Sequence, residues 1–342
     1  MKKTLPLLLT LLALGLAACD VEEVRVLDQE TGRCEATEYM AFDPVNHAPQ
    51  DARLDAIDRM LALFAEASAD PTTAAAKAKA IRDVYESPTT NLAAKVEGRT
   101  DVHDPDAPLG AEMKAAIDGA LELLEDASTA TEVSIAKQRF EKAGIYRFLF
   151  HSVLQELWAP SRKHYDEAYG YLGSGETNAP GGRRGLASVA TKRDGVNGTT
   201  LAEELFDHLL VGACALETAL NERAADEMKV DDDPAYLAAA QAIDRKLRVV
   251  IAYSIGHELV EIRKAGADVD AALIKLEEAD GYFSILERSL LRGTDAQKQL
   301  AEELRAAIDD AMAAGDGSWI AGFPADDLLD LINDAFSITV KG

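Results

Sequence analysis

The chain has 342 residues, with 60 acidic and 35 basic side chains and a formal net charge of −25. With 48% hydrophobic residues it is too apolar to be disordered, and it is long enough for one large domain or two smaller ones. The negative charge excludes a general nucleic-acid binder, which needs a basic surface to displace the counterions of phosphate groups. Three cysteines and eleven prolines exclude a disulfide-rich or a collagen-like scaffold.

The first residues predict a bacterial lipoprotein. Lys2 and Lys3 precede an apolar run over residues 5–16, which is too short for a comfortable transmembrane helix. The run leads into Leu-Ala-Ala-Cys, which resembles the lipobox of bacterial lipoproteins. The resemblance implies that a signal peptide, residues 1–18, is removed and that Cys19 is lipidated. The acyl chains would then anchor the protein in the cell envelope, on the periplasmic face or at the outer membrane.

Residues 19–50 carry the proposed lipid and have little periodicity, so they predict a tether. Two cysteines remain, Cys34 and Cys214. In an exported protein they could be joined by a disulfide. Because Cys214 stands between two alanines in a helical stretch, a buried free thiol is the alternative.

From residue 51 onward the pattern predicts helices almost throughout, because alanine is abundant and apolar residues recur at spacings of three and four. No strand-like alternation is sustained, so we expect an all-α fold of packed helix bundles without a sheet. The expected helices span residues 51–68, 73–86, 109–127, 130–158, 161–172, 200–229, 234–264, 267–291, 294–314 and 325–335. The expected N-caps are Asp51, Thr200 and Thr294.

Two stretches interrupt these helices. Residues 87–108 contain three prolines and predict a loop with one short helical piece. Residues 173–199 are rich in glycine and predict a loop longer than ordinary helix connections, which is often functional. Its basic side chains are Arg183, Arg184, Lys192 and Arg193. They make the loop a candidate contact for an anion or a partner protein, with a solvated insertion as the alternative.

A short motif occurs twice. Residues 166–172 read Asp-Glu-Ala-Tyr-Gly-Tyr-Leu and residues 277–283 read Glu-Glu-Ala-Asp-Gly-Tyr-Phe, and each follows a long apolar helix containing a histidine. The repeat predicts two related halves, about 51–172 and 200–340 within an all-α domain over 51–340, unless two alanine-rich helices match by chance. A glycine inside each helix indicates a close helix crossing or a neighbouring ligand.

The first copy, His-Tyr-Asp-Glu-Ala-Tyr-Gly-Tyr-Leu-Gly at residues 164–173, resembles the His-Trp-Asp-Glu-Ala-Phe-Gly-Tyr motif of an uncharacterised family of bacterial lipoproteins. More loosely, the chain is similar to imelysin-like, iron-regulated envelope proteins, whose signature is Gly-x-His-x-x-Glu. Gly256, His257 and Glu261 approach that signature with a different spacing. The resemblance implies duplicated helical bundles and a role in iron uptake.

Pairs of histidine and carboxylate side chains at spacings of three or four are the candidate metal ligands, because such pairs share one helix face. The pairs are His164 with Glu167, His257 with Glu261, and Glu204 with His208. Nitrogen and carboxylate ligands that converge from several helices would suit iron or zinc.

Besides Glu261, two further polar residues lie on apolar helix faces, Glu258 and His151. Glu258 and Glu261 share the apolar arc of their helix, where a charge is costly unless it is paired or holds a cation. His151 lies on a helix that is apolar nearly all round, and it is a further candidate ligand. Arg147 on the same helix could instead form a salt bridge with Glu258 or Glu261 and leave no open metal site.

Two hypotheses of function follow. The first is an envelope lipoprotein that binds iron, zinc or an iron-bearing ligand for uptake or storage. The second is a metal-free interaction or scaffold lipoprotein that docks an envelope protein through residues 173–199. A hydrolase of metallopeptidase type is a third possibility, but the chain contains no Gly-x-Ser-x-Gly or His-Glu-x-x-His motif and no phosphate or dinucleotide loop.

Overall fold

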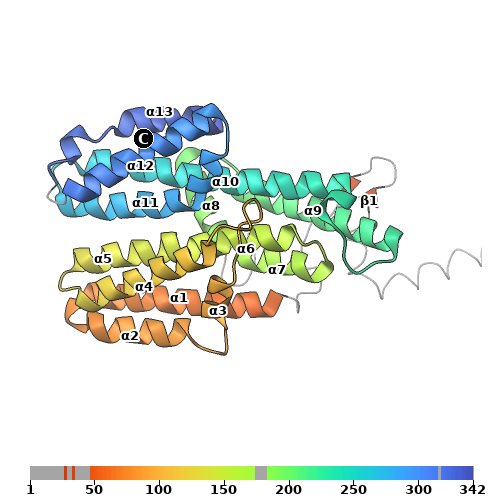
Figure 1. Cartoon of the computed structure of the whole chain (residues 1–342), viewed down its shortest axis with the longest axis horizontal. Coiled ribbons are helices and arrows are strands. Elements are labelled where there is room, and N and C mark those ends of the chain that lie inside the picture. Colours follow the sequence, from red (N-terminus) through yellow and green to blue (C-terminus); the bar gives the residue numbers. More distant parts are fainter. Residues whose placement is uncertain (1–26, 29–32, 35–46, 174–182, 315–316, 342) are drawn as a thin grey trace, which may run out of the picture.

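The structure is a computed structural model that describes residues 27–28, 33–34, 47–173, 183–314 and 317–341. These residues fold almost entirely into helices, which confirms the expected all-α fold (Figure 1). The predicted signal peptide, the predicted lipidation site Cys19 and most of the predicted tether lie outside the described residues.

The helices form two layers in chain order. In Figure 1, α1–α7 form the lower layer and α9–α13 the upper layer, with α8 at their junction. The lower helices are α1 Ala48–Ala69, α2 Ala74–Tyr85, α3 Leu92–Glu97, α4 Leu109–Asp126, α5 Ala130–Gln138, α6 Arg147–Leu157 and α7 Arg162–Leu172. The remaining helices are α8 Gly185–Asn197, α9 Leu201–Arg223, α10 Pro234–Ala265, α11 Val269–Leu291, α12 Asp295–Ala314 and α13 Ala325–Phe336. Short 3₁₀ turns occur at Pro71–Thr73, Val230–Asp232 and Ile320–Gly322.

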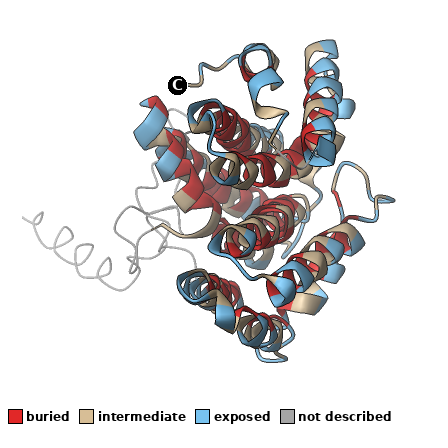
Figure 2. Ribbon diagram, turned by 90° about the vertical axis from the view of Figure 1, so that its left-hand side faces the viewer, coloured by how far each residue is buried: buried red, intermediate tan, exposed pale blue. Residues whose placement is uncertain are grey.

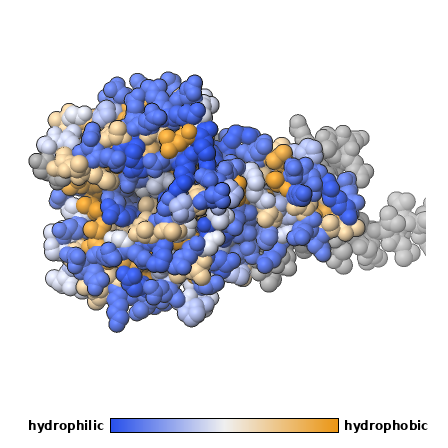
Figure 3. Space-filling model, in the orientation of Figure 1, coloured by the Kyte–Doolittle hydropathy of each residue, from blue (hydrophilic) through white to orange (hydrophobic). Residues whose placement is uncertain are grey.

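One hydrophobic core runs through both layers. It includes Phe64 and Leu149 in the lower layer and Ile251 and Phe283 in the upper layer. Figure 2 shows buried residues on the helix faces that are turned toward one another and exposed residues on the outer faces. In Figure 3 hydrophilic side chains cover most of the visible face, in keeping with the strong negative charge. No helix of the described part of the chain is long and apolar enough to span a membrane.

The long helix expected over residues 130–158 is not uniform. Between α5 and α6 the chain forms a π-helical segment, Arg139–Tyr146. A π-helix closes its hydrogen bonds over five residues, which rotates the side chains relative to an α-helix and often marks a functional region. Here it buries Glu141 and Lys142 where α11 crosses the segment.

Two expectations need correction. The single loop predicted over residues 173–199 is wrong for its second half, because residues 185–197 form α8. The predicted absence of any sheet has one small exception, since β1 Leu27–Asp28 pairs antiparallel with β2 Arg33–Cys34. This two-residue pair lies against α9.

Cys214 in α9 is disulfide-bonded rather than a free thiol. The side chain of Cys34 lies outside the described part of the structure, although its backbone in β2 contacts α9.

Candidate functional site

The structure does not bring the predicted metal ligands into one cluster. Among the described residues, no group of three or more His, Cys, Asp and Glu side chains is arranged to hold a metal ion. In α7, the ring Nδ1 of His164 lies 2.6 Å from the carbonyl oxygen of Ala159, and the nearest cation to Glu167 is Lys163 at 3.8 Å. Glu204 in α9 pairs with Lys246 of α10.

The predicted ligands of α10 have cations nearby. Glu261 lies 3.2 Å from Lys264 in the same helix. His257 is half-buried, and burial together with the nearby Arg193 guanidinium lowers the pKa of its imidazole to about 4. Iron or zinc binding at these residues therefore stays a prediction, because the described residues form no cluster of metal ligands around them.

Glu258 belongs to a buried charge cluster that sequence reasoning did not assemble. The cluster consists of Glu141 and Lys142 of the π segment, Arg193 of α8, Glu258 of α10, and Lys275 and Glu278 of α11. Lys142 Nζ lies 3.2 Å from Glu141 and 3.4 Å from Glu278. Lys275 Nζ lies 2.8 Å from Glu258 and 3.0 Å from Glu278. The π segment, α8, α10 and α11 thus share one ionic network.

Within this cluster Glu258 has the least exposed side chain. Its side chain is 1% exposed, and Arg193 Nη1 lies 3.9 Å from its carboxylate. Burial, followed by the negative charge of Glu278, raises the pKa of Glu258 to about 7, although Lys275 opposes the shift. Because Lys142, Lys275 and Arg193 already supply positive charge here, a metal ion would have to displace them.

The repeated motif marks close helix crossings. A Cβ atom at Gly281 would lie 2.5 Å from the Cβ of Lys142, and one at Gly170 would lie 2.8 Å from the Cβ atoms of His47 and Gln50. Both glycines therefore let a neighbouring helix approach, which is the first of the two explanations that the sequence left open.

The tyrosine after each glycine has a cation over its ring. Lys142 Nζ lies 5.2 Å from the ring centre of Tyr282, and the Arg99 guanidinium carbon lies 4.9 Å from that of Tyr171. These are cation–π contacts within the packed body of the protein.

Arg147 does not pair with Glu258 or Glu261, so that expectation is wrong. Its Nη2 donates to Glu112 at 2.6 Å, and Arg288 also contacts Glu112. The pairing joins α6 and α11 to α4 instead of joining α6 to α10.

His151 lies beside these arginines at the junction of the layers. Its side chain is buried, and burial with the neighbouring positive charges of Arg147 and Arg248 lowers the pKa of the imidazole to about 3, against the opposing effect of Asp101. The adjoining cavity of about 10 Å³ has room for about one water molecule. A neutral histidine among arginines is a poor fit for a metal site, because nearby cations repel a metal ion.

The cations predicted to contact an anion or a partner are mostly engaged. Arg184 pairs with Asp55 and Asp58 of α1, which ties the start of α8 to the lower layer. Arg193 is 7% exposed and faces Glu258, so its predicted role as a surface contact is wrong. Lys192 is exposed on α8, and Arg183 Nη1 lies 3.4 Å from the Thr191 hydroxyl.

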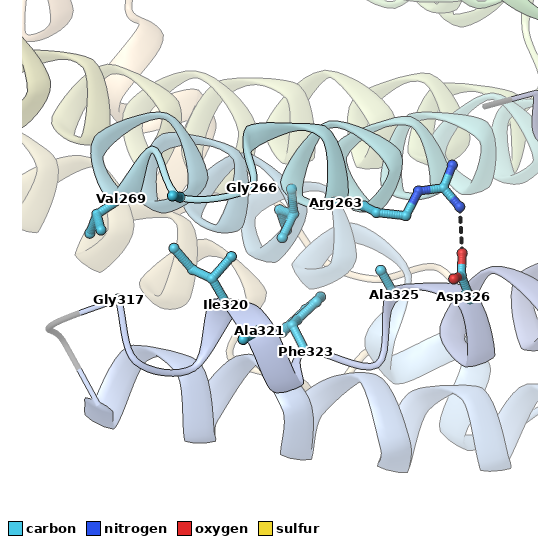
Figure 4. A pocket seen from close by; sticks show the side chains of 11 residues that line it. Arg263, Gly266, Val269, Gly317, Ile320, Ala321, Phe323, Ala325 and Asp326 are labelled. Carbon is cyan, nitrogen blue, oxygen red and sulfur yellow. Dashed lines mark hydrogen bonds and ion pairs between the residues drawn. The ribbon is translucent and has the colours of Figure 1, made fainter.

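Sequence reasoning missed a groove in the upper layer, at the turn where α10 leads into α11. Figure 4 shows this groove from close by. Its volume is about 600 Å³, and it runs between the end of α10, the turn into α11 and residues 317–326. Its lining residues are Ile262, Arg263, Gly266, Ala267, Val269, Gly317, Ile320, Ala321, Phe323, Ala325 and Asp326. The sequence signal was the presence of Trp319, Ile320 and Phe323 in a short segment between two predicted helices.

No family model, curated protein or solved structure matches this chain. The likeness to bacterial lipoproteins and to imelysin-like proteins accordingly rests on the residues quoted above.

Proposed function

We propose that this protein is a lipid-anchored envelope protein that binds a small, largely apolar ligand without a resident metal. The observation that carries the proposal is the groove in Figure 4. Its volume of about 600 Å³ falls within the range of about 300–1,000 Å³ that is common for small-molecule sites. Its walls are mainly aliphatic and aromatic, with one ion pair at the rim, which is also the usual composition of such sites.

The charges of the buried cluster support a metal-free protein. Glu141, Glu258 and Glu278 each have a lysine within hydrogen-bonding or ion-pair distance. A carboxylate that is paired with an ammonium group, or that keeps its proton as Glu258 does with a pKa of about 7, gains less from binding a metal ion. These charges therefore favour a metal-free protein over the hypothesis of iron uptake.

The test compares dye binding and metal content in the same preparations. An environment-sensitive apolar dye should bind the wild type, and Ala321→Trp should weaken binding about tenfold because the indole fills the groove. Ala313→Trp is the matched control, since Ala313 is exposed on α12 and does not line the groove. Elemental analysis of the wild type and of a His257→Ala/Glu261→Ala variant runs in parallel. Stoichiometric iron or zinc that is lost in this variant, with unchanged dye binding in Ala321→Trp, would overturn the proposal.

The envelope location rests on residues 1–19 and has its own test. In a bacterial host, Cys19→Ser should abolish incorporation of labelled fatty acid, because the acylated side chain is missing. The protein should then move from the membrane fraction to the soluble fraction. Unchanged membrane association of Cys19→Ser would contradict lipid anchoring.

A further inference from the structure

We propose that the groove binds a molecule with a long apolar body and a single carboxylate head, and that Arg263 binds the carboxylate. The inference rests on the proposed function and specifies its ligand class. Three features support it: the apolar walls of the groove, the single cation Arg263 among its lining residues, and the acidic side chain of Asp326 that forms an ion pair with this cation.

The walls of the groove are apolar over most of their length. Ile262 of α10 and Val269 of α11 line the groove together with Ile320 and Phe323 of the later segment. Figure 4 shows Ile320 and Phe323 on the segment opposite Val269. Gly317 lies at one end of the groove. Its backbone has φ +76°, and a Cβ atom there would lie 2.6 Å from the side chain of Val269, so the two segments are in close contact at this end. An alkyl chain fits such walls, since their side chains carry no hydrogen-bonding group apart from Arg263 and Asp326.

Charge is confined to the other end of the groove. Among the lining residues, Arg263 is the one cation and Asp326 the one anion, and the two form an ion pair across the rim. Asp326 accepts from Nη1 of Arg263, and no other described acceptor contacts this guanidinium. The remaining donors of the planar fork are therefore open to a second carboxylate or to an exchange of partners.

The ion pair with Asp326 shows that Arg263 can bind a carboxylate at the rim of the groove. A ligand carboxylate has the same planar shape and charge, so it can replace Asp326 on Arg263 without a change in geometry. The pair is easily exchanged because the two side chains are 45% and 75% exposed and screened by solvent. A dianionic phosphate would gain the same single guanidinium, but with two negative charges it is repelled more strongly than a monoanionic carboxylate by Asp326 and by a protein of net charge −25.

The experiment uses the full-length lipidated protein in lipid nanodiscs and photoreactive C16 probes. One probe carries a carboxylate and the other a primary alcohol on the same chain, and cross-linked peptides are mapped by mass spectrometry. We expect the carboxylate probe to label residues 262–269 and 317–326 and to exceed the alcohol probe there about tenfold.

Two variants at the rim should act in opposite directions. Arg263→Gln should reduce carboxylate labelling to the level of the alcohol, whereas Asp326→Asn should increase carboxylate labelling because it removes the competing acid. Loss of structure alone would not raise labelling in either variant. Arg59→Gln, an exposed arginine on α1, is the control and should match the wild type.

The outcomes separate the inference from the proposed function. Equal labelling of the groove by acid and alcohol would overturn the carboxylate assignment and leave an apolar binding groove in place. The same conclusion would follow if Arg263→Gln had no effect on the ratio. Labelling confined to residues outside the groove with both probes would overturn the inference and the proposed function together.

Discussion

Glu258 shows how a single residue takes its properties from several elements. The helical pattern of the sequence places this acidic residue on an apolar face of α10. Two explanations for a charge at such a position were open, a bound metal ion and a salt bridge. In the fold its partners are Lys275 and Glu278 of α11 and Arg193 of α8. None of these partners lies within ten residues of Glu258 in sequence, so residue spacing alone did not reveal them.

The raised pKa of Glu258 predicts a pH dependence of stability. The folded protein keeps this proton up to about pH 7, whereas the unfolded chain loses it near pH 4.5. Folding therefore takes up a proton between these values, and the stabilising contribution present below pH 4.5 is lost as the pH rises through 7. Because Gln cannot ionise, Glu258→Gln should gain stability relative to the wild type by up to about 3 kcal/mol between pH 5 and pH 8.

Urea unfolding of both proteins at a series of pH values measures this difference. Glu203→Gln, which changes an exposed residue of α9, should follow the wild-type curve. A difference between Glu258→Gln and wild type that stays constant with pH would show that Glu258 is ionised throughout the range.

Helix ends and crossings illustrate the element scale. The expected cap Thr294 is confirmed, because its hydroxyl accepts from the backbone N–H of Gln297 while the Gln297 side chain accepts from the N–H of Thr294. Asp51 is not a cap, since α1 already begins at Ala48. Thr200 precedes α9 but makes no side-chain cap, and Asp194 of α8 takes this role from outside the helix.

Asp194 should therefore stabilise the start of α9. Its two carboxylate oxygens accept from the N–H groups of Leu201 at 2.7 Å and Ala202 at 2.9 Å. Asp194→Ala should lower the free energy of unfolding by about 1–2 kcal/mol, as the loss of an N-cap does. Thr200→Ala should cost less than about 0.5 kcal/mol, because its hydroxyl contacts only the exposed Glu204. Chemical denaturation gives both values, and the reverse order would refute the assignment of the cap.

The crossing at Gly281 predicts a large effect of a small side chain. Alanine there would place its methyl group 2.5 Å from the Cβ of Lys142 and 3.2 Å from the backbone nitrogen of Ala143. Gly281→Ala should destabilise the protein by about 1–3 kcal/mol, because α11 must move away from the π segment. Gly119→Ala in α4 is the control with open space, and it should stabilise the protein by about 0.4–1 kcal/mol. Thermal unfolding measures both effects. If Gly281→Ala unfolded at the same midpoint as the wild type, α11 and the π segment would not be in close contact.

At the scale of the whole molecule, the two layers depend on each other. The hydrophobic core is continuous through both, and Arg139 binds Glu277 through two hydrogen bonds of 2.7 and 3.0 Å across the interface. The apolar contacts of the lower layer therefore continue into the upper layer. That the layers arose by duplication stays a prediction, because the repeated motif is the feature that suggests it.

The continuous core predicts cooperative unfolding. Calorimetry should show a single transition whose calorimetric and van't Hoff enthalpies agree, because unfolding of one layer would expose apolar surface that the other layer buries. Arg139→Ala should lower the midpoint and keep one transition, since it weakens a half-buried interface pair. Two resolved transitions would show that the layers are independent domains.

The sequence by itself determined the all-α class and most helix positions, because helix periodicity and residue propensity act over a few neighbouring residues. It located the two glycines inside helices, but the structure decided that they mark helix crossings and not a ligand. Only the tertiary structure decided that residues 185–197 form a helix, that Arg147 pairs with Glu112, and that Lys275 pairs with Glu258. The groove likewise joins the end of α10 to residues 317–326, more than fifty residues away. The partner of a buried charge and the walls of a groove depend on which helices meet, and that is set by packing of the whole core rather than by local spacing.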